Sequence, residues 1–386
     1  MVRINNRTVV GTITACVFQK ERPHIGGQGA QRFQKNKRQL ASFVRMLPEI
    51  SVHSGFGDKV FYQHFARGLE AHFHLPSETL SLSRFTSTTY RKTTYLSRID
   101  KEGQPWLLLK VFSEDQLGHQ SLRALRENDG AKAFGKVAGV IAPTIVDVFA
   151  FSGRGFPRYN LAVAETILPG KPALYYLERA AEKQEEERVE LLGKMTRAFE
   201  SSAIMLSRVH SMLIGGSLIE AKTIFGETVE ILSWLTSVGV FTQRENHQIV
   251  TAIKSFRDGS QTARVVLAHR DYTSNNMMFD LAEESMGIID FEKSENECAA
   301  KDLAKFTESL FVDGRSIGLS DDEIGCMQQS FLEAYQYFSD VRSPEFWQQL
   351  AFYQIYSALS FARYQVKKSN TEQVLVLKER ILSLLP

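Results

Sequence analysis

The stretch that decides the fold reads Val265-Val266-Leu267-Ala268-His269-Arg270-Asp271-Tyr272-Thr273-Ser274-Asn275-Asn276. A second short apolar run, Gly287-Ile288-Ile289, ends in Asp290, which follows Asp271 by 19 residues. Short apolar runs of this kind are typical of buried strands. The separation leaves room for a loop, a short strand, a turn over residues 280–285 and a return strand. We therefore expect two strand ends that each deliver polar side chains.

The polar residues at these strand ends are of the types that phosphoryl transfer requires. That reaction asks the protein for positioning and charge, with little covalent chemistry. Asp271 could accept the proton of a substrate hydroxyl, while Asn276 and Asp290 offer oxygen ligands for Mg²⁺. His269 and Arg270 complete the catalytic motif, and we expect His269 to support the loop and not to carry a proton. The alternative is two ordinary strand ends with polar turns.

A single lysine, Lys110, lies inside the apolar segment Trp106–Phe112, which predicts a buried strand. A charge in such a strand is costly unless it is paired. The expected partner is Glu127, 17 residues further on in a predicted helix over 120–133, with Asp129 as the competing acid. The pattern predicts a lysine that binds nucleotide phosphates and pairs with a helix glutamate. The alternative is a lysine that reaches out from an edge strand.

These motifs resemble those of the aminoglycoside phosphotransferase and choline kinase superfamily, which are small-molecule relatives of protein kinases. The similarity covers about residues 84–365 and extends to Asp302-Leu303-Ala304 and to Phe331-Leu332-Glu333-Ala334-Tyr335. One departure is Arg270, because glycine is common at that place among antibiotic kinases, whereas arginine occurs in protein kinases and some lipopolysaccharide-core sugar kinases. Another is Asp290-Phe291-Glu292, which lacks the glycine of the protein-kinase Asp-Phe-Gly motif.

The resemblance implies an α+β, two-lobed, protein-kinase-like fold with an antiparallel five-stranded N-lobe sheet, one helix and a mainly helical C-lobe. The expected domains are an N-terminal extension over 1–80, partly mobile and with a helix near 58–72, an N-lobe over 81–167, and a C-lobe with the catalytic loop over 168–386. ATP and Mg²⁺ are the implied cofactors. Ser87 and Thr88 of a glycine-free loop would bind phosphate, and backbone groups of Ala164, Glu165 and Thr166 would bind the adenine.

Composition sets the outer bounds of this interpretation. The chain has 386 residues, is 43% hydrophobic and carries a net charge of +2, so it can build ample core and no nucleic-acid partner is expected. Cys16, Cys298 and Cys326 are interpreted as free thiols in a reducing compartment, which favours a cytoplasmic protein. No apolar run reaches the ~18 residues of a transmembrane helix. The oligomeric state cannot be predicted.

Two hypotheses of different classes remain open. The first is an ATP-dependent phosphotransferase that moves the γ-phosphate to a hydroxyl of a small molecule, such as a sugar, an amino alcohol or an aminoglycoside-like compound. Its alternative acceptor is a lipopolysaccharide-core or capsule sugar, suggested by Arg270 and by the basic segment 23–37. The second hypothesis is a catalytically silent pseudokinase that serves as a binding module, which only the glycine-free loop favours.

Overall fold

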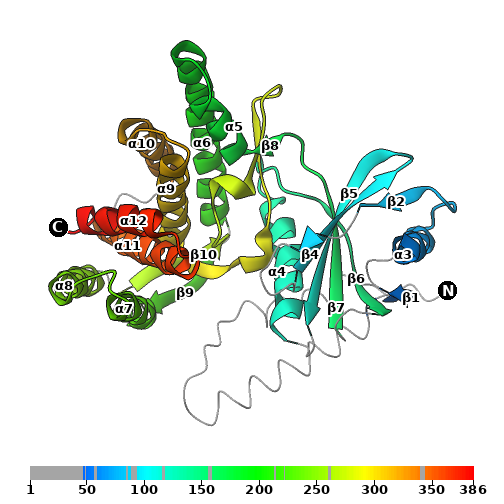
Figure 1. Cartoon of the computed structure of the whole chain (residues 1–386), viewed down its shortest axis with the longest axis horizontal. Coiled ribbons are helices and arrows are strands. Elements are labelled where there is room, and N and C mark those ends of the chain that lie inside the picture. The colour runs from blue at the N-terminus through cyan, green and yellow to red at the C-terminus, as the bar shows by residue number, and fades with distance from the viewer. Residues whose placement is uncertain are drawn as a thin grey trace, which may run out of the picture. The chain divides into compact units, whose positions relative to one another are not determined.

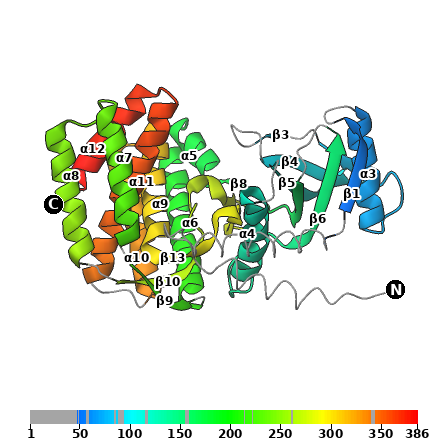
Figure 2. The same ribbon diagram turned by 90° about the horizontal axis from the view of Figure 1, so that it is seen from below.

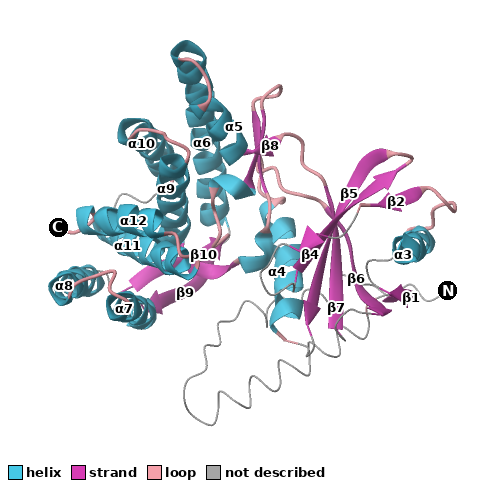
Figure 3. Cartoon of the chain, viewed as in Figure 1, coloured by secondary structure: helices cyan, strands magenta, loops and turns pink. Residues whose placement is uncertain are grey.

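A computed structural model describes residue 47 and residues 49–55, 59–83, 86–87, 94–114, 118–154, 159–212, 214–220, 222–259, 262–339 and 344–386. The chain forms two compact units (Figure 1). Unit 1 contains residues up to 136, 142–168 and 290–294, and unit 2 contains residues 137–141, 169–289 and 295–386. Strands dominate the first and helices the second (Figure 3). The predicted α+β class is confirmed.

Unit 1 is built on one sheet, with strand order β1–β6–β7–β5–β4–β2 and β3 also paired to β4 among the described residues. Its strands are β1 (Glu49–Gly55), β2 (Leu80–Leu82), β3 (Thr86–Ser87), β4 (Thr94–Lys101), β5 (Gln104–Glu114), β6 (Ile145–Arg154) and β7 (Tyr159–Thr166). β3, β4, β5, β7 and β6 form the predicted antiparallel sheet. β2 adds an antiparallel strand and β1 pairs in parallel with β6, so the sheet is wider than predicted.

Side-chain alternation along β5 gives the two faces of this sheet different roles. Leu107, Leu109 and Val111 point to one face and share a core with α3 (Lys59–His72). Lys110 is out of phase with them and therefore points to the opposite face. On that face α4 (His119–Phe134) packs against β5 and β7. One polar residue in an apolar strand thus faces a helix.

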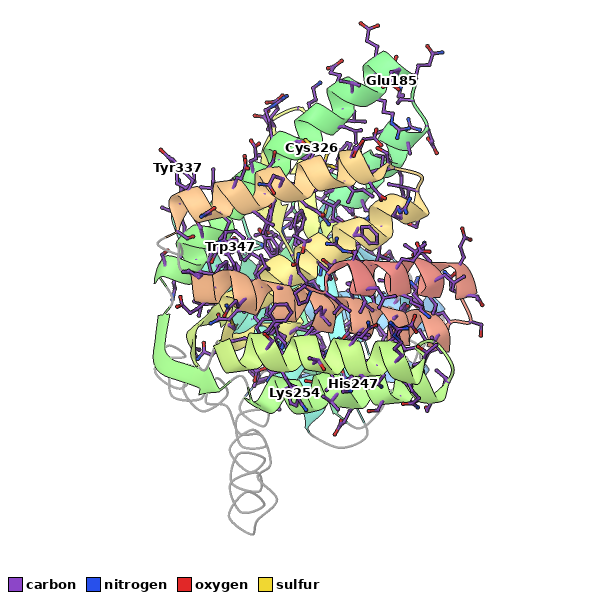
Figure 4. The ribbon with its side chains drawn as sticks, turned by 90° about the vertical axis from the view of Figure 1, so that its left-hand side faces the viewer. Glu185, His247, Lys254, Cys326, Tyr337 and Trp347 are labelled. Carbon is purple, nitrogen blue, oxygen red and sulfur yellow. The ribbon has the colours of Figure 1, made fainter. Side chains whose placement is uncertain are left out.

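Unit 2 is mainly helical. Its helices are α5 (Ala173–Ala181), α6 (Glu185–Met212), α7 (Lys222–Ser237), α8 (Gln243–Gly259), α9 (Ala299–Ser316), α10 (Asp321–Phe338), α11 (Pro344–Lys367) and α12 (Thr371–Ser383). α11 packs against α7, α8, α9 and α12, and α6 packs against α5 and α10 (Figure 2). Figure 4 shows this stack from the side, with Cys326 and Tyr337 on α10 and Trp347 on α11. No helix in the described ranges is long and apolar enough to cross a membrane.

Two small sheets carry the polar loops of unit 2. β10 (Thr262–Ala268) lies between β9 (Ile214–Glu220) and β13 (Glu295–Cys298), neither of which was predicted. β11 (Met277–Asp280) and β12 (Ser285–Ile288) form the predicted hairpin, and β8 (Lys171–Pro172) pairs with β11. Gly170 precedes β8 with φ +87°, and a Cβ there would lie 2.1 Å from the Phe279 carbonyl oxygen. Only glycine fits this close approach.

Candidate active site

The loop after β10 is organised by His269, whose side chain is fully buried. Its Nε2 lies 2.9 Å from the Ile289 carbonyl oxygen, and the Asp271 N–H donates to its Nδ1 at 3.3 Å. This pairing assigns the ring proton to Nε2, because Nδ1 must act as the acceptor. Both ring nitrogens are therefore engaged in holding the backbone, which is the supporting role expected of His269.

Asp302 on α9 fixes the same loop through its backbone. Its Oδ2 accepts a hydrogen bond from the His269 N–H at 2.7 Å, and its Oδ1 accepts one from the Arg270 N–H at 2.6 Å. His210 Nε2 lies 3.2 Å from Oδ2, and His210 Nδ1 lies 2.9 Å from the Tyr335 hydroxyl. Arg270 has φ +65°, a left-handed conformation that is unfavourable without such support. The buried carboxylate thus holds the loop in a strained shape.

Asp271, the predicted base, is only slightly exposed and lies beside a cation. Lys305 Nζ of α9 is 3.6 Å from Asp271 Oδ1 and 4.1 Å from the centre of the Phe361 ring. The preceding Arg270 forms an ion pair with Glu295 of β13. The sequence interpretation assigned no role to Lys305 or to Glu295 as a partner of Arg270. Their contacts arise from residues distant in sequence, and no local pattern indicates them.

Asn276, a predicted metal ligand, is built into the end of the same loop. Its Nδ2 donates to the Asp271 carbonyl oxygen at 2.8 Å, which leaves the amide oxygen as the atom that could bind a metal. The Asn276 carbonyl oxygen accepts a hydrogen bond from the Ile289 N–H at 2.9 Å. Ile289 directly precedes Asp290 in the chain. Within the described residues, no group of three or more His, Cys, Asp or Glu side chains could hold a metal ion. An amide oxygen such as that of Asn276 is a ligand type that Mg²⁺ accepts.

Lys110 lies at the centre of an acidic cluster in unit 1. Its Nζ is 2.7 Å from Glu127 Oε1, 3.1 Å from Glu165 Oε1 and 3.7 Å from Asp290 Oδ1. Burial alone lowers the pKa of Lys110, but the three carboxylates outweigh it, so the pKa lies well above its usual range. Lys110 is therefore charged. The expected Lys110–Glu127 pair is present, and Glu127 rather than Asp129 is the partner.

The segment that follows Asp290 holds α4 in place. Asp290 has φ +69° and precedes the short helix η2 (Phe291–Lys293). Arg123 of α4 pairs with Glu292, and the rings of Phe134 and Phe291 lie 4.9 Å apart. A Cβ on Gly130 would lie 2.8 Å from the Phe291 Cβ, so glycine permits this close packing. The helix that carries Glu127 is thereby fastened to the chain next to Asp290.

The residues of β7 that were predicted to bind the adenine lie within or at the end of a paired strand. Ala164 pairs with Leu109 on one side and Asp147 on the other, and the Thr166 N–H donates to the Thr144 carbonyl oxygen. The sheet thus engages backbone groups of Ala164 and Thr166, and their expected contact with the adenine stays a prediction. Ser87 lies in β3, paired with Tyr95, and Thr88 lies outside the described residues.

A protein-family model matches the part of the chain that carries the catalytic loop. The model of a family described as the phosphotransferase enzyme family (APH) matches residues 228–325, a range that contains Asp271, Asn276, Asp290 and Asp302. The resemblance to the aminoglycoside phosphotransferase and choline kinase superfamily is confirmed. The chain has the fold of small-molecule kinases, and no curated protein sequence matches it.

Solved structures with this fold include three kinases of different substrates. A glucosamine kinase in complex with glucosamine, ADP and inorganic phosphate is 16% identical, with a TM-score of 0.56 over 86% of this chain and 84% of that chain. A thermostable mutant of aminoglycoside phosphotransferase APH(4)-Ia, in a ternary complex with ADP and hygromycin B, is 14% identical (TM-score 0.53, 83% and 97%). A Plasmodium vivax ethanolamine kinase is 13% identical (TM-score 0.51, 96% of both chains). At these identities the similarity concerns the fold alone.

Proposed function

We propose that the protein is an ATP- and Mg²⁺-dependent phosphotransferase acting on a hydroxyl of a small molecule. The observation that carries the proposal is the buried Lys110 ammonium, which contacts both the α4 glutamate and Asp290. A lysine held between a helix glutamate and a metal-binding aspartate is the phosphate-binding arrangement of kinase-like enzymes. A catalytically silent pseudokinase that serves as a binding module would need neither this costly buried charge nor the proton acceptor Asp271, so the enzyme is the better proposal.

The proposed roles divide between the two parts of the chain. In the nucleotide part, 81–167, Lys110 binds phosphate oxygens and Glu127 orients it. In the acceptor part, 168–386, Asp271 accepts the proton of the substrate hydroxyl, and Arg270 and His269 shape its loop. Asn276 and Asp290 hold Mg²⁺, which would neutralise charge on the phosphates. Use of ATP would place the protein in the cytoplasm.

The acceptor class is the least constrained part of the proposal. Kinases of glucosamine and ethanolamine share the fold, so amino sugars and amino alcohols are the first acceptors to consider. Arg270 and the basic segment 23–37 were the reasons to consider a lipopolysaccharide-core or capsule sugar. Arg270 is paired with Glu295 within the protein, and the segment 23–37 lies outside the described residues. Such a sugar stays the alternative acceptor.

The test is a screen of sugars, amino alcohols and aminoglycosides for acceptor-dependent release of ADP, with ATP and GTP as donors. We expect turnover with one acceptor class and its loss in Asp271→Asn, which keeps the size of the side chain but cannot accept the proton. Nucleotide binding should persist in this variant. Equal turnover in the variant and the wild type would refute the assigned base, and no binding of any nucleotide would refute the kinase proposal.

A further inference from the structure

Glu165 is a buried charged residue in the otherwise apolar run Leu161-Ala162-Val163-Ala164-Glu165 of β7. Ala162 and Ala164 belong to the core on the α3 face of the sheet, so Val163 and Glu165 point to the α4 face. In the antiparallel pairing of β5 with β7, Lys110 is opposite Val163 and Leu108 is opposite Glu165. Glu165 and Lys110 are thus diagonal neighbours on one face of the sheet.

The side chains of Glu165 and Lys110 are in contact, as this strand register predicts. Glu165 Oε1 lies 3.1 Å from Lys110 Nζ, which also contacts Glu127 Oε1 at 2.7 Å. Both glutamates are buried, and the Oε2 atom of each has no hydrogen-bond partner within the part of the chain that the structure describes. A buried carboxylate with an unsatisfied oxygen is costly, so Glu165 does not serve stability in an obvious way.

We propose that Glu165 is a positioning residue for the phosphate-binding lysine, acting as a second carboxylate beside Glu127; this rests on the proposed function. The two glutamates reach Lys110 from different elements, one from helix α4 and one from the sheet that carries the lysine itself. Two anchors define the place of the ammonium better than one. Lys110 therefore keeps one glutamate partner, in addition to the more distant Asp290, when either glutamate is neutralised.

This arrangement predicts a characteristic pattern of substitutions. The variants are Glu165→Gln, Glu127→Gln, the double variant, and Lys110→Met as the reference for complete loss of the lysine's charge. Glutamine preserves the size of each side chain and removes its charge. The readouts are the Kd of Mg²⁺–ADP by calorimetry on the full chain and, once an acceptor is known, kcat and both KM values.

We expect each single variant to weaken Mg²⁺–ADP binding about threefold to tenfold, a change that corresponds to the loss of one of the two glutamate contacts of Lys110. The Kd of the double variant for Mg²⁺–ADP should approach that of Lys110→Met. KM for the acceptor should stay constant while kcat falls, which a general loss of structure would not produce. Wild-type affinity in Glu165→Gln, together with no added loss in the double variant, would overturn the proposal. The proposal would also be overturned if Glu127→Gln alone bound Mg²⁺–ADP as weakly as Lys110→Met.

A second measurement separates this inference from the proposed function. Unfolding of Lys110→Met, Glu165→Gln and their combination in urea forms a double-mutant cycle that needs no nucleotide. Non-additive effects are expected because the two side chains are in contact, and strict additivity would overturn the pairing even if the protein is a kinase. Glu308→Gln is the control, because Glu308 is a buried carboxylate paired with Arg380 in unit 2. It should leave Mg²⁺–ADP binding unchanged. Absence of nucleotide binding by the wild type, with a non-additive cycle, would instead refute the proposed function.

Discussion

Asp302 is the single residue on which the shape of the loop that carries Asp271 most depends. Its two oxygens accept from two successive N–H groups, and an asparagine has only one oxygen to offer. In Asp302→Asn the new NH₂ group would therefore face one of these backbone N–H donors, which would lower the free energy of unfolding by about 1–3 kcal/mol. We expect a lower melting temperature and at least a tenfold fall in kcat.

The matched control for this change is Asp313→Asn on the same helix. Asp313 accepts a hydrogen bond from the Ser274 hydroxyl, and an asparagine oxygen can still accept it. The control should therefore lose less stability and less activity than Asp302→Asn. Equal losses in the two variants would show that the loop does not depend on the paired acceptors of Asp302.

Lys305 is a second single residue for which the structure predicts an effect on catalysis. Its ammonium lies 3.6 Å from Asp271 Oδ1 and is held against the Phe361 ring, so it places a positive charge beside the proposed base. Lys305→Met should lower kcat about tenfold, since that charge would stabilise negative charge developing during transfer. Lys305→Arg should recover part of the activity. Calorimetry should find nucleotide affinity unaltered; a change confined to nucleotide affinity would contradict this role.

Among the elements, α4 depends on its contact with η2. Gly130→Ala would gain up to about 1 kcal/mol of helix propensity. The new methyl group would, however, lie 2.8 Å from the Phe291 Cβ and 2.9 Å from the Ser294 Oγ. Overpacking of this kind costs about 1–3 kcal/mol, so we expect a net loss of stability and weaker nucleotide binding, because Glu127 shares the helix. Gly325→Ala on α10, where a Cβ would meet nothing within 4 Å, should be neutral or stabilising.

The contact between α6 and α10 predicts a pH dependence. Glu323 accepts two hydrogen bonds from Arg188 and completes a capping box with Ser320, which together lower its pKa to about 2. Because the folded pKa is depressed, this stabilisation is complete above the unfolded pKa of about 4.3 and is lost as the pH falls towards 2. Solvent screening limits it to about 1–2 kcal/mol. Urea unfolding of Glu323→Gln should show this deficit at pH 7 and a shrinking one below pH 4; a constant deficit would contradict the assignment.

For the molecule as a whole, nucleotide binding should appear as a gain in stability. A ligand at 100 times its Kd stabilises the state that binds it by about 2.7 kcal/mol. Mg²⁺–ATP should therefore raise the melting temperature, and Asp290→Ala should remove the rise because it deletes the proposed metal carboxylate. Differential scanning calorimetry with and without EDTA checks this. An undiminished rise in the variant would exclude Asp290 from the metal site.

Local patterns in the sequence were sufficient for most of the fold. The apolar runs around Lys110 and before His269 predicted strands because burial selects apolar side chains at those positions. A helix was predicted over 120–133, where α4 lies, and the family resemblance implied the mainly helical C-lobe. β9 and β13 could not be predicted, because short strands paired only with β10 have no periodicity of their own. β1 likewise joins the sheet through pairing with β6, which lies about 100 residues away in the chain.

The sequence by itself determined the chemical types at the candidate site: a lysine with a helix glutamate, an aspartate after a strand, and an amide and a carboxylate for a metal. Residue type and spacing along the chain are sufficient for these. Only the tertiary structure decided that Lys110 has Glu165 as a second glutamate partner and that Lys305 lies beside Asp271. Each of these depends on strand register or on helix packing between distant segments, and contacts of that kind leave no local pattern in the sequence.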